Sequence, residues 1–225
     1  MAELLECVER QAGEDAALTV VLLHGLGADG HDFVPIVPEL RLPFGVRFVF
    51  PHAPVRPVTI NGGLAMRAWY DIYGFGPGSP EDAAGLEKSA AHVRALLDRE
   101  IARGQPEERI VLAGFSQGGA VALHTALRSA RGVAGVIALS TYLPLAREAP
   151  PARPGLPVFM AHGTADPIIP LMLAEASRDL LAARGCTVRW RSYAMAHSVC
   201  PEEVRDIADW LVELRAAVDA APPGR

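Results

Sequence analysis

The sequence predicts an α/β protein whose central sheet is mainly parallel and is covered by helices on both faces. Apolar, β-branched runs such as 18–23 alternate along the chain with segments in which apolar residues recur every three or four positions. Several of the apolar runs are continuous, which is typical of strands that are buried on both faces. In addition, a G-x-S-x-G turn at 114–118 joins the apolar run 110–113 directly to a helix-forming segment.

The composition is that of an ordinary globular protein, and we expect residues 1–225 to form a single domain. The 26 acidic and 21 basic residues give a net charge of −5, without a basic cluster, so we expect no nucleic-acid partner. No apolar run approaches the roughly 18 residues of a membrane span, and the N-terminus lacks the basic start of a signal peptide. These features predict a cytoplasmic protein with free thiols at Cys7, Cys186 and Cys200.

The first half of the chain contains two buried strands, a long connection and a helix. A weakly patterned N-terminal segment includes a short edge strand near 4–8, and strands follow at 18–23 and 46–50. Residues 51–80 form a connection rich in proline, glycine and aromatic residues, a composition that favours a functional loop. Helical spacing of apolar residues, closed by a glycine, predicts a helix over 81–103.

The second half repeats the alternation of strand and helix. Its predicted elements are strand 110–113, helix 119–127, strand 133–140, strand 158–161, helix 170–184, strand 187–191 and a helix that begins at Pro201. The strand at 187–191 alternates polar and apolar residues, as a half-exposed strand does. Proline is favoured in the first turn of a helix. We expect residues 219–225 to be a frayed tail.

The turn Gly114–Gly118 has the pattern of a nucleophile elbow. Its central residue, Ser116, lies between a strand and a helix, where a sharp turn directs the hydroxyl outward. Such a turn brings backbone segments so close together that glycine is needed on either side. The pattern alone is common by chance, but in this context it predicts a serine nucleophile.

A serine nucleophile needs a base, and the base needs an acid that orients it. In α/β-hydrolases the acid and then the histidine follow the serine in the chain. Asp166 comes just after the strand 158–161, and His197 comes after the strand 187–191. The carboxyl ends of parallel strands meet at one edge of a sheet, so these loops converge. Because His197 is the only histidine after Asp166, we expect Ser116, Asp166 and His197 to form a catalytic triad.

Acyl transfer also needs backbone N–H groups that stabilise the negative charge on the carbonyl oxygen. One donor is expected from Gln117, directly after the nucleophile, and the other from the loop that follows strand 18–23. In the turn His24–Gly27 of that loop, Leu26 is the expected donor.

The same loop also fits a dinucleotide-binding pattern, because Gly25–Gly30 reads G-x-G-x-x-G after a strand. That pattern requires an acid at the end of the next strand for the ribose hydroxyls. Here the strand 46–50 runs into Pro-His-Ala-Pro, without an acid. We therefore reject a dinucleotide site.

Seven segments spread along the chain match one known family. They are LHGLGADGHDF at 23–33, PHAP at 51–54, PVTINGG at 57–63, MRAWYDI at 66–72, GFSQGGA at 114–120, HGTADPIIP at 162–170 and AHSV at 196–199. On these segments the chain resembles, nearly end to end, the carboxylesterase/acyl-protein thioesterase group, the phospholipase/carboxylesterase family of α/β-hydrolases. Segments 57–63 and 66–72 are the most specific, because general hydrolase chemistry does not demand them. One departure is Ala196, where many members carry glycine.

The resemblance implies an α/β-hydrolase fold without a large cap and a reaction without a metal or cofactor. It assigns the same roles as the chemistry above: Ser116 as nucleophile, Asp166 as acid, His197 as base, and Leu26 and Gln117 as oxyanion donors.

The resemblance further implies that the loop 57–75 lines the acyl site. Met66, Trp69 and Phe75 are then the expected substrate-binding residues. For Met66 and Trp69, simple core packing is an almost equally strong alternative.

We expect a serine hydrolase that cleaves carboxylic esters, and thioesters, of short to medium acyl chains through an acyl-enzyme intermediate. One alternative is an acyl-protein thioesterase or lysophospholipase that acts on long-chain acyl substrates. Another, from a different class, is a non-catalytic binding module on a hydrolase fold, against which the complete triad argues. The expected partner is a small-molecule ester or thioester, and the sequence leaves open whether the chain forms a homodimer.

Overall fold

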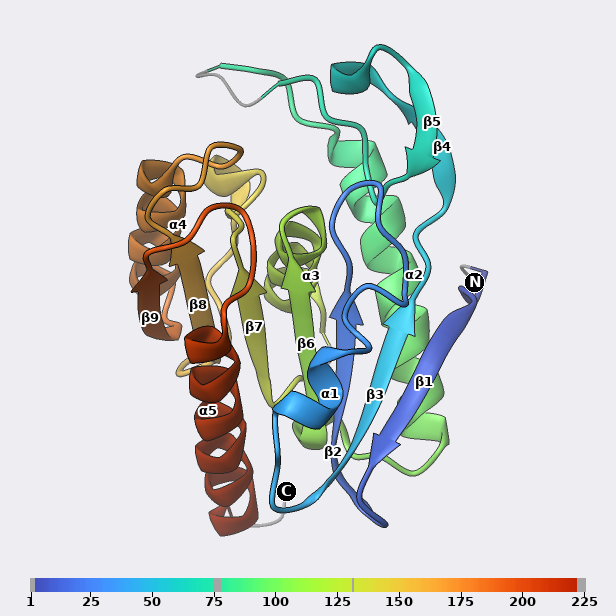
Figure 1. The fold of residues 1–225 in the computed structure, drawn as a ribbon, viewed down its shortest axis with the longest axis vertical. Coiled ribbons are helices and arrows are strands. Elements are labelled where there is room, and N and C mark those ends of the chain that lie inside the picture. The colour runs from blue at the N-terminus through green and yellow to red at the C-terminus, as the bar shows by residue number, and fades with distance from the viewer. Residues whose placement is uncertain (1–2, 75–77, 131, 222–225) are drawn as a thin grey trace.

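The computed structural model describes residues 3–74, 78–130 and 132–221 and confirms the α/β-hydrolase architecture (Figure 1). A seven-stranded sheet has the order β1-β3-β2-β6-β7-β8-β9, and β1 is antiparallel to β3 while the other neighbouring pairs are parallel. The strands are β1 (Cys7–Ala12), β2 (Ala16–Leu23), β3 (Gly45–Pro51), β6 (Ile110–Phe115), β7 (Gly135–Leu139), β8 (Pro157–Gly163) and β9 (Thr187–Tyr193).

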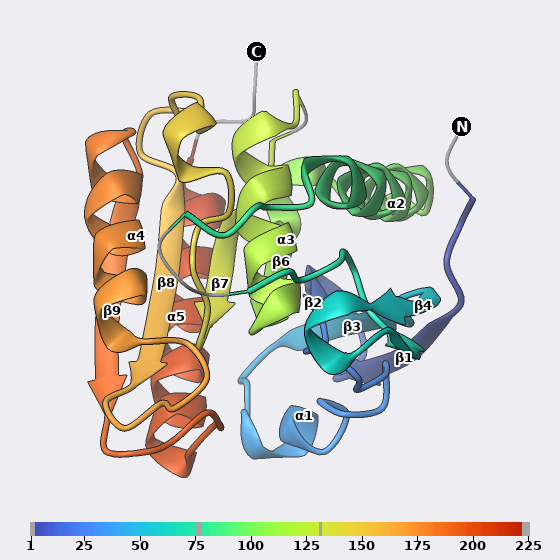
Figure 2. The ribbon, with the colours of Figure 1, turned by 90° about the horizontal axis from the view of Figure 1, so that it is seen from above.

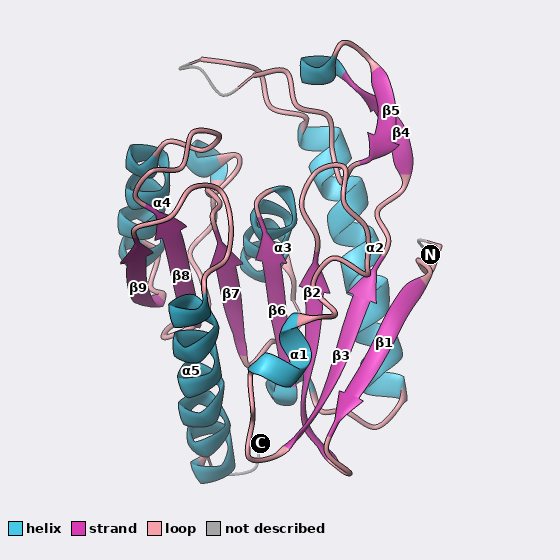
Figure 3. Cartoon of the chain, viewed as in Figure 1, coloured by secondary structure: helices cyan, strands magenta, loops and turns pink. Residues whose placement is uncertain are grey.

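Helices cover the sheet on both faces, as the sequence predicts. They are α1 (Ile36–Glu39), α2 (Ala83–Ala102), α3 (Gln117–Arg128), α4 (Leu171–Ala183) and α5 (Pro201–Ala220). Figure 1 shows α1 and α5 in front of the sheet, and Figure 2 shows α1 and α2 on opposite sides of it. Figure 3 shows how short α1 is beside the other helices. Among the helices that the structure describes, none combines the length and apolar character needed to cross a bilayer.

Each face of the sheet has its own apolar core. In β2, Val21 and Leu23 pack into the core that contains α2, α3 and α4, whereas Val20 and Leu22 pack into the core that contains α5. Successive side chains of a strand point to opposite faces. The continuous apolar run in β2 therefore reflects burial on both sides, as predicted.

The two edges of the sheet also follow the sequence prediction. The expected N-terminal edge strand is β1, which pairs only with β3 and begins a few residues later than its predicted position near 4–8. At the other edge, β9 is partly exposed along its length. Its alternating sequence is explained by this position, because one face packs on the protein while the other meets solvent.

Three details differ from the prediction. The connection 51–80 contains an antiparallel hairpin of β4 (Val55–Val58) and β5 (Leu64–Arg67), which rises beyond the carboxyl ends of the main sheet (Figure 1). Strands of four residues, one of them interrupted by a proline, give little periodic signal. The short helix α1 was not predicted for the same reason. The predicted tail from 219 is wrong at its start, since residues 219 and 220 belong to α5, and 222–225 lie outside the described residues.

Helix α5 buries a carboxyl group in its first turn. Glu203 is fully buried, and this burial raises its pKa to about 8, with the nearby Asp206 charge adding to the effect. The folded protein therefore keeps Glu203 protonated at neutral pH, whereas the unfolded chain ionises it near pH 4.5.

We expect Glu203→Gln to flatten the pH dependence of stability between about pH 4.5 and 8. In that window the unfolded state has lost a proton that the folded state keeps, so the wild type loses stability as the pH rises. The loss from one such group is at most about 1.4 kcal/mol per pH unit. Urea unfolding at several pH values measures it. The matched control is Glu202→Gln, because Glu202 is exposed and its pKa is lowered. Parallel profiles for Glu203→Gln and wild type would contradict the assignment.

Candidate active site

The turn between β6 and α3 has the geometry of a nucleophile elbow. Ser116 has φ 53° and ψ −119°, in a region that residues with a side chain rarely adopt. A Cβ atom at Gly114 would overlap the backbone of Gly118, and one at Gly118 would overlap the carbonyl of Leu23. The structure thus confirms that both flanking positions require glycine.

Two hydrogen bonds hold the strained elbow in place. The Ser116 N–H donates to the Leu139 carbonyl oxygen over 2.8 Å, and the Thr141 hydroxyl donates to the Ser116 carbonyl oxygen over 2.7 Å. Both partners come from the end of β7 or just beyond it, so the neighbouring strand supports the elbow. Strain of this kind costs on the order of 1–3 kcal/mol and persists only where the surroundings enforce it.

Asp166 and His197 are hydrogen-bonded to each other at the same edge of the sheet. Nδ1 of His197 lies 2.7 Å from Oδ2 of Asp166. The other carboxylate oxygen accepts the N–H groups of Ile168 and Ile169 over 2.8 and 2.9 Å. Burial opposes ionisation of Asp166, but the bonds from His197, Ile169 and Ile168 outweigh it and hold its pKa below the usual value. The ionised carboxylate accepts the Nδ1 proton, so Nε2 of His197 is the nitrogen with a free lone pair.

The backbone explains how residues 31 positions apart come together. The Ala165 N–H donates to the Met195 carbonyl oxygen over 3.1 Å. A Cβ atom at Gly163 would overlap the carbonyl oxygens of Met195 and Ala196. The histidine loop therefore crosses the end of β8 so closely that only glycine fits at this position. On its other side, the His197 ring packs on Phe115 with the ring centroids 4.8 Å apart. The imidazole therefore lies against the residue that precedes Ser116.

A second histidine near Asp166 has a structural role. Nε2 of His162 lies 3.4 Å from Oδ2 of Asp166, but it also lies 2.9 Å from the Ile169 carbonyl oxygen, which can only accept a hydrogen bond. The His162 side chain is fully buried and stacks on Trp190. It supports the loop that carries Asp166 rather than facing solvent.

The predicted oxyanion loop is fixed by the side chain of His24. Its Nε2 accepts the Ala53 N–H over 3.0 Å, and its Nδ1 lies 2.7 Å from the Gly25 carbonyl oxygen, to which it donates. Burial lowers the pKa of His24 to about 4, so the ring is neutral at physiological pH. His24 therefore has a structural role, since both ring nitrogens hold the backbone of this loop and of residue 53 in place.

The loop lies directly against the elbow. A Cβ atom at Gly25 would lie 3.6 Å from the Ser116 Cβ atom. Gln117 begins α3, and the first N–H groups of a helix have no partner within the helix. The backbone of Gln117 and the turn that contains Leu26 thus both lie close to Ser116.

The side chain of Gln117 has a function that sequence reasoning missed. It is buried, accepts the Trp69 N–H over 2.8 Å and donates to the Tyr70 carbonyl oxygen over 2.7 Å. The Trp69 indole in turn donates to the His24 carbonyl oxygen over 2.9 Å. This chain of bonds joins the elbow, the segment 66–72 and the oxyanion loop. These bonds give a physical reason for finding the segment 66–72 and the elbow in the same sequence, because each holds the other in place.

The three predicted substrate-binding residues differ in their placement. Met66 is half-buried in β5, and a Cβ atom at Gly27 would lie 3.7 Å from its sulfur. Trp69 is fully buried, so the structure places its ring in the core beneath the oxyanion loop and favours the core-packing alternative for it. Phe75 lies outside the described residues.

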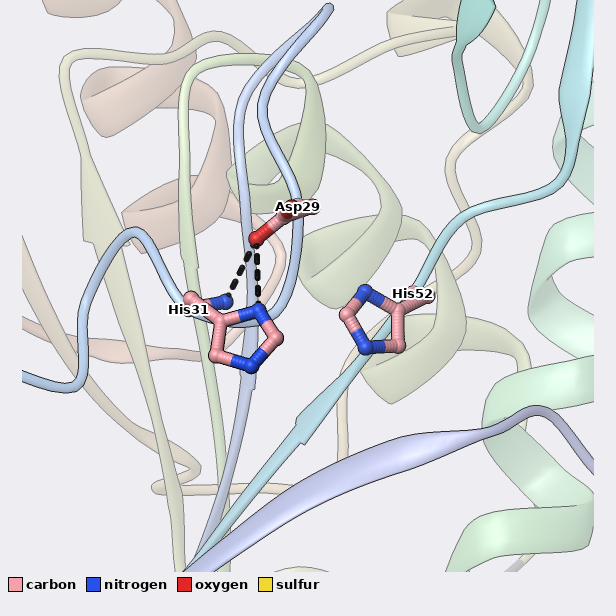
Figure 4. A group of neighbouring side chains, drawn as sticks. All are labelled: Asp29, His31 and His52. Atoms are coloured by element: carbon pink, nitrogen blue, oxygen red, sulfur yellow. Dashed lines mark hydrogen bonds and ion pairs between the residues drawn. The ribbon is translucent and has the colours of Figure 1, made fainter.

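Among the described residues, one cluster has the residue types of a metal site (Figure 4). The candidate ligand atoms of Asp29, His31 and His52 lie within 4.8 Å of one another. However, Nδ1 of His52 accepts the Gly30 N–H over 3.0 Å, which places the proton of the neutral ring on Nε2. Neither nitrogen of His52 then offers a free lone pair. The side chain of Asp29 already accepts two hydrogen bonds from His31. This arrangement does not fit a three-ligand metal centre.

Comparisons with known proteins agree with the fold and with the resemblance seen in the sequence. The chain matches the phospholipase/carboxylesterase family over residues 6–214. It is 40% identical over 210 residues to acyl-protein thioesterase 1 of Neurospora crassa, covering 87% of this chain and 86% of that protein. It is 38% identical to acyl-protein thioesterase 1 of Cryptococcus neoformans, covering 87% of this chain and 91% of that protein.

Solved structures with the same fold include close matches over most of the chain. The crystal structure of Zea mays acyl-protein thioesterase 2 superposes with a TM-score of 0.83 at 29% identity, covering 93% of this chain and 99% of that one. Arabidopsis thaliana SOBER1 superposes with a TM-score of 0.82 at 30% identity, covering 88% and 98%. With the family match, these likenesses establish that the chain is a serine hydrolase that belongs to the phospholipase/carboxylesterase family.

Proposed function

We propose that Ser116, Asp166 and His197 are the catalytic triad of an esterase that cleaves carboxylic esters and thioesters of short to medium acyl chains. The observation that carries this proposal is the bond between the ionised Asp166, whose side chain is buried, and His197, whose ring packs on Phe115 in the elbow of Ser116. A strained serine beside an oriented imidazole is the arrangement that nucleophilic acyl transfer requires.

In the first half of the proposed reaction, Nε2 of His197 takes the Ser116 proton while Oγ attacks the acyl carbon. Asp166 stabilises the imidazolium that forms. Negative charge develops on the carbonyl oxygen, and the backbone N–H groups of Leu26 and Gln117 stabilise it. Each such donor typically contributes about 3–4 kcal/mol of transition-state stabilisation.

The first half ends when the bond between the acyl carbon and the leaving oxygen or sulfur breaks, and the leaving atom takes the proton from His197. In the second half, water takes the place of the released alcohol or thiol. His197 takes a proton from this water, hydroxide adds to the acyl carbon, and the bond to Ser116 breaks as its oxygen recovers the proton. The acid product then leaves and the free enzyme is restored. The proposed chemistry needs no metal or cofactor.

The proposed acyl site lies on the side of Ser116 where β5 meets the oxyanion loop. Met66 is the wall residue we propose there, because it is half-buried beside Gly27. Trp69 supports this site from beneath, through its bond to the His24 carbonyl oxygen.

A second candidate is a thioesterase for long-chain acylated proteins. It is favoured by the names of the two relatives near 40% identity, which are acyl-protein thioesterases. A series of p-nitrophenyl esters and acyl thioesters of increasing chain length separates the candidates. The first proposal expects kcat/KM to be highest at short to medium chains, whereas a maximum at the longest chains supports the second.

A fluorophosphonate probe tests the nucleophile directly. We expect stoichiometric labelling of the wild type at Ser116, found by mass spectrometry of the labelled peptide. Labelling should disappear in Ser116→Ala and persist in Ser198→Ala, the matched change at an exposed serine next to His197. Labelling that survives Ser116→Ala would show that another residue is the nucleophile.

A further inference from the structure

A groove of about 1000 Å³ opens between residues 32–43, which include α1, and the helix α5. We call it the α1–α5 groove. Figure 1 shows both helices on the front face of the sheet, below the loop that carries His197. His197, Ser198 and Phe115 are among the residues that line it. The groove is therefore continuous with the proposed catalytic centre, and none of the proposed steps above uses it.

The groove has apolar walls and a charged rim. Its walls include Phe33, Ile36, Leu40, Phe115, Val204 and Ala208. Its charged residues are Asp32, Glu39, Arg41, Arg205 and Asp209. Apolar walls with a few charged groups, in a volume at the upper end of the 300–1,000 Å³ range, are typical of small-molecule sites. The groove is large enough for a substantial part of a substrate.

Reaction chemistry decides which half of an ester this groove faces. When the tetrahedral intermediate collapses, the bond between the acyl carbon and the leaving oxygen or sulfur breaks. The leaving atom takes the proton that His197 removed from Ser116, so the charges balance and a neutral alcohol or thiol is released. The leaving atom must therefore be within hydrogen-bond reach of His197. Because His197 lines the groove, the rest of the leaving group has a direct path into it.

The acyl half of the substrate is expected to lie away from the α1–α5 groove. The proposed acyl wall, Met66, lies beside Gly27 of the oxyanion loop, and it is not part of the groove lining. A substrate whose carbonyl carbon meets Ser116 thus extends one half toward β5 and the other half toward α5.

We infer that the α1–α5 groove binds the leaving group of the substrate, a bulky amphipathic alcohol or thiol. This inference rests on the proposed function and adds a substrate class to it. The apolar walls fit a large hydrocarbon or aromatic body. The rim carries acids and arginines together, so it favours neutral or zwitterionic leaving groups over those with several charges of one sign. Small leaving groups such as methanol use almost none of this surface.

Filling the groove from α5 tests the inference. Ala208 is a half-buried wall residue, and Ala208→Phe adds a ring there. The matched control is Ala216→Phe, the same change at an exposed position two turns further along α5 and outside the groove lining. Substrates share one acyl group and differ in the leaving group: methyl butyrate and 2-naphthyl butyrate. A second series shares p-nitrophenol and varies the acyl chain.

We expect Ala208→Phe to lower kcat/KM for 2-naphthyl butyrate about tenfold or more, with less than about a twofold change for methyl butyrate. The acyl-chain profile should keep its shape, and Ala216→Phe should resemble wild type throughout. If Ala208→Phe instead shifts the acyl-chain preference, the groove holds the acyl half and the inference is overturned. If Ala208→Phe leaves kcat/KM at the wild-type value for both esters, the groove lies outside the substrate path.

A second variant tests the inference if Ala208→Phe does not fold, and a binding measurement tests it if no ester is cleaved. Val204→Ala trims the same wall, and we expect a rise of about threefold in KM for 2-naphthyl butyrate. Binding of 2-naphthol, followed by its fluorescence, needs no catalysis. If no ester is cleaved but 2-naphthol binds wild type and not Ala208→Phe, the proposed function fails while the groove assignment holds. If esters are cleaved but 2-naphthol binds both proteins equally, the groove assignment fails alone.

Discussion

Replacement of Ser116 by alanine should lower kcat for p-nitrophenyl butyrate by a factor on the order of 10⁶. Removal of the hydroxyl leaves no atom to form the acyl-enzyme, and the remaining groups provide only binding and oxyanion stabilisation. Alanine retains the Cβ atom and therefore the strain at φ 53°. We expect the unfolding temperature to stay close to that of wild type, which separates a chemical loss from a folding defect.

Ser116→Gly provides the complementary control. Glycine adopts positive φ without the clash of a Cβ atom, so relief of strain should raise the free energy of unfolding by roughly 1 kcal/mol. Activity should be lost as fully as in Ser116→Ala. Gain of stability together with loss of activity would show that the elbow holds its serine at a cost to the fold. Hydrolysis by either variant within tenfold of wild type would rule out Ser116 as the nucleophile.

Asp166→Asn should lower kcat by a factor of about 10⁴ while leaving the fold intact. An asparagine oxygen can still accept the N–H groups of Ile168 and Ile169, as the carboxylate does. However, the amide NH₂ placed opposite Nδ1 of His197 is a donor. It favours the tautomer that carries the proton on Nε2, where the base needs a free lone pair. The loss should therefore appear in kcat for every ester tested.

The pH dependence distinguishes this mechanism from a general charge effect. Hydrogen bonds hold the pKa of Asp166 below its usual value, so the carboxylate is ionised throughout the neutral range. The ionised Asp166 contributes to the free energy of unfolding at pH values above its pKa in the unfolded chain. This contribution is lost as the pH falls through the lowered pKa that Asp166 has in the folded protein. Raising the pH should not restore activity to Asp166→Asn. The matched control is Asp179→Asn, an exposed carboxylate paired with Arg178 on α4, which should retain wild-type kinetics. More than a tenth of wild-type activity in Asp166→Asn would contradict the orienting role.

Local steric rules explain why the elbow was readable from the sequence. The overlap of any Cβ atom at Gly114 or Gly118 with nearby backbone forces glycine on both sides of Ser116. Such a constraint leaves a pattern within five residues. The convergence of Asp166 and His197 was also predictable, because both follow parallel strands whose carboxyl ends share one edge of the sheet.

Other parts of the site depend on contacts between distant segments. The buried side chain of Gln117 bonds to the backbone of Trp69 and Tyr70, 48 and 47 positions away, and nothing in the local pattern marks this role. Trp69 illustrates the same limit, since an aromatic residue in a loop is equally consistent with a substrate wall and with the core. Its full burial and its bond to His24 favour the second interpretation.

The order of strands and helices, the elbow and the triad candidates thus follow from periodicity and from steric demands that act over a few residues. The β4–β5 hairpin and α1 are local elements that are too short to give a periodic signal. The α1–α5 groove, by contrast, arises where segments far apart in the sequence meet, since α1 ends at Glu39 and α5 begins at Pro201. A groove is the space left between two helices, and its shape depends on how far each helix lies from the other on the sheet. No residue encodes that separation alone, because it results from the packing of both helices against the same core.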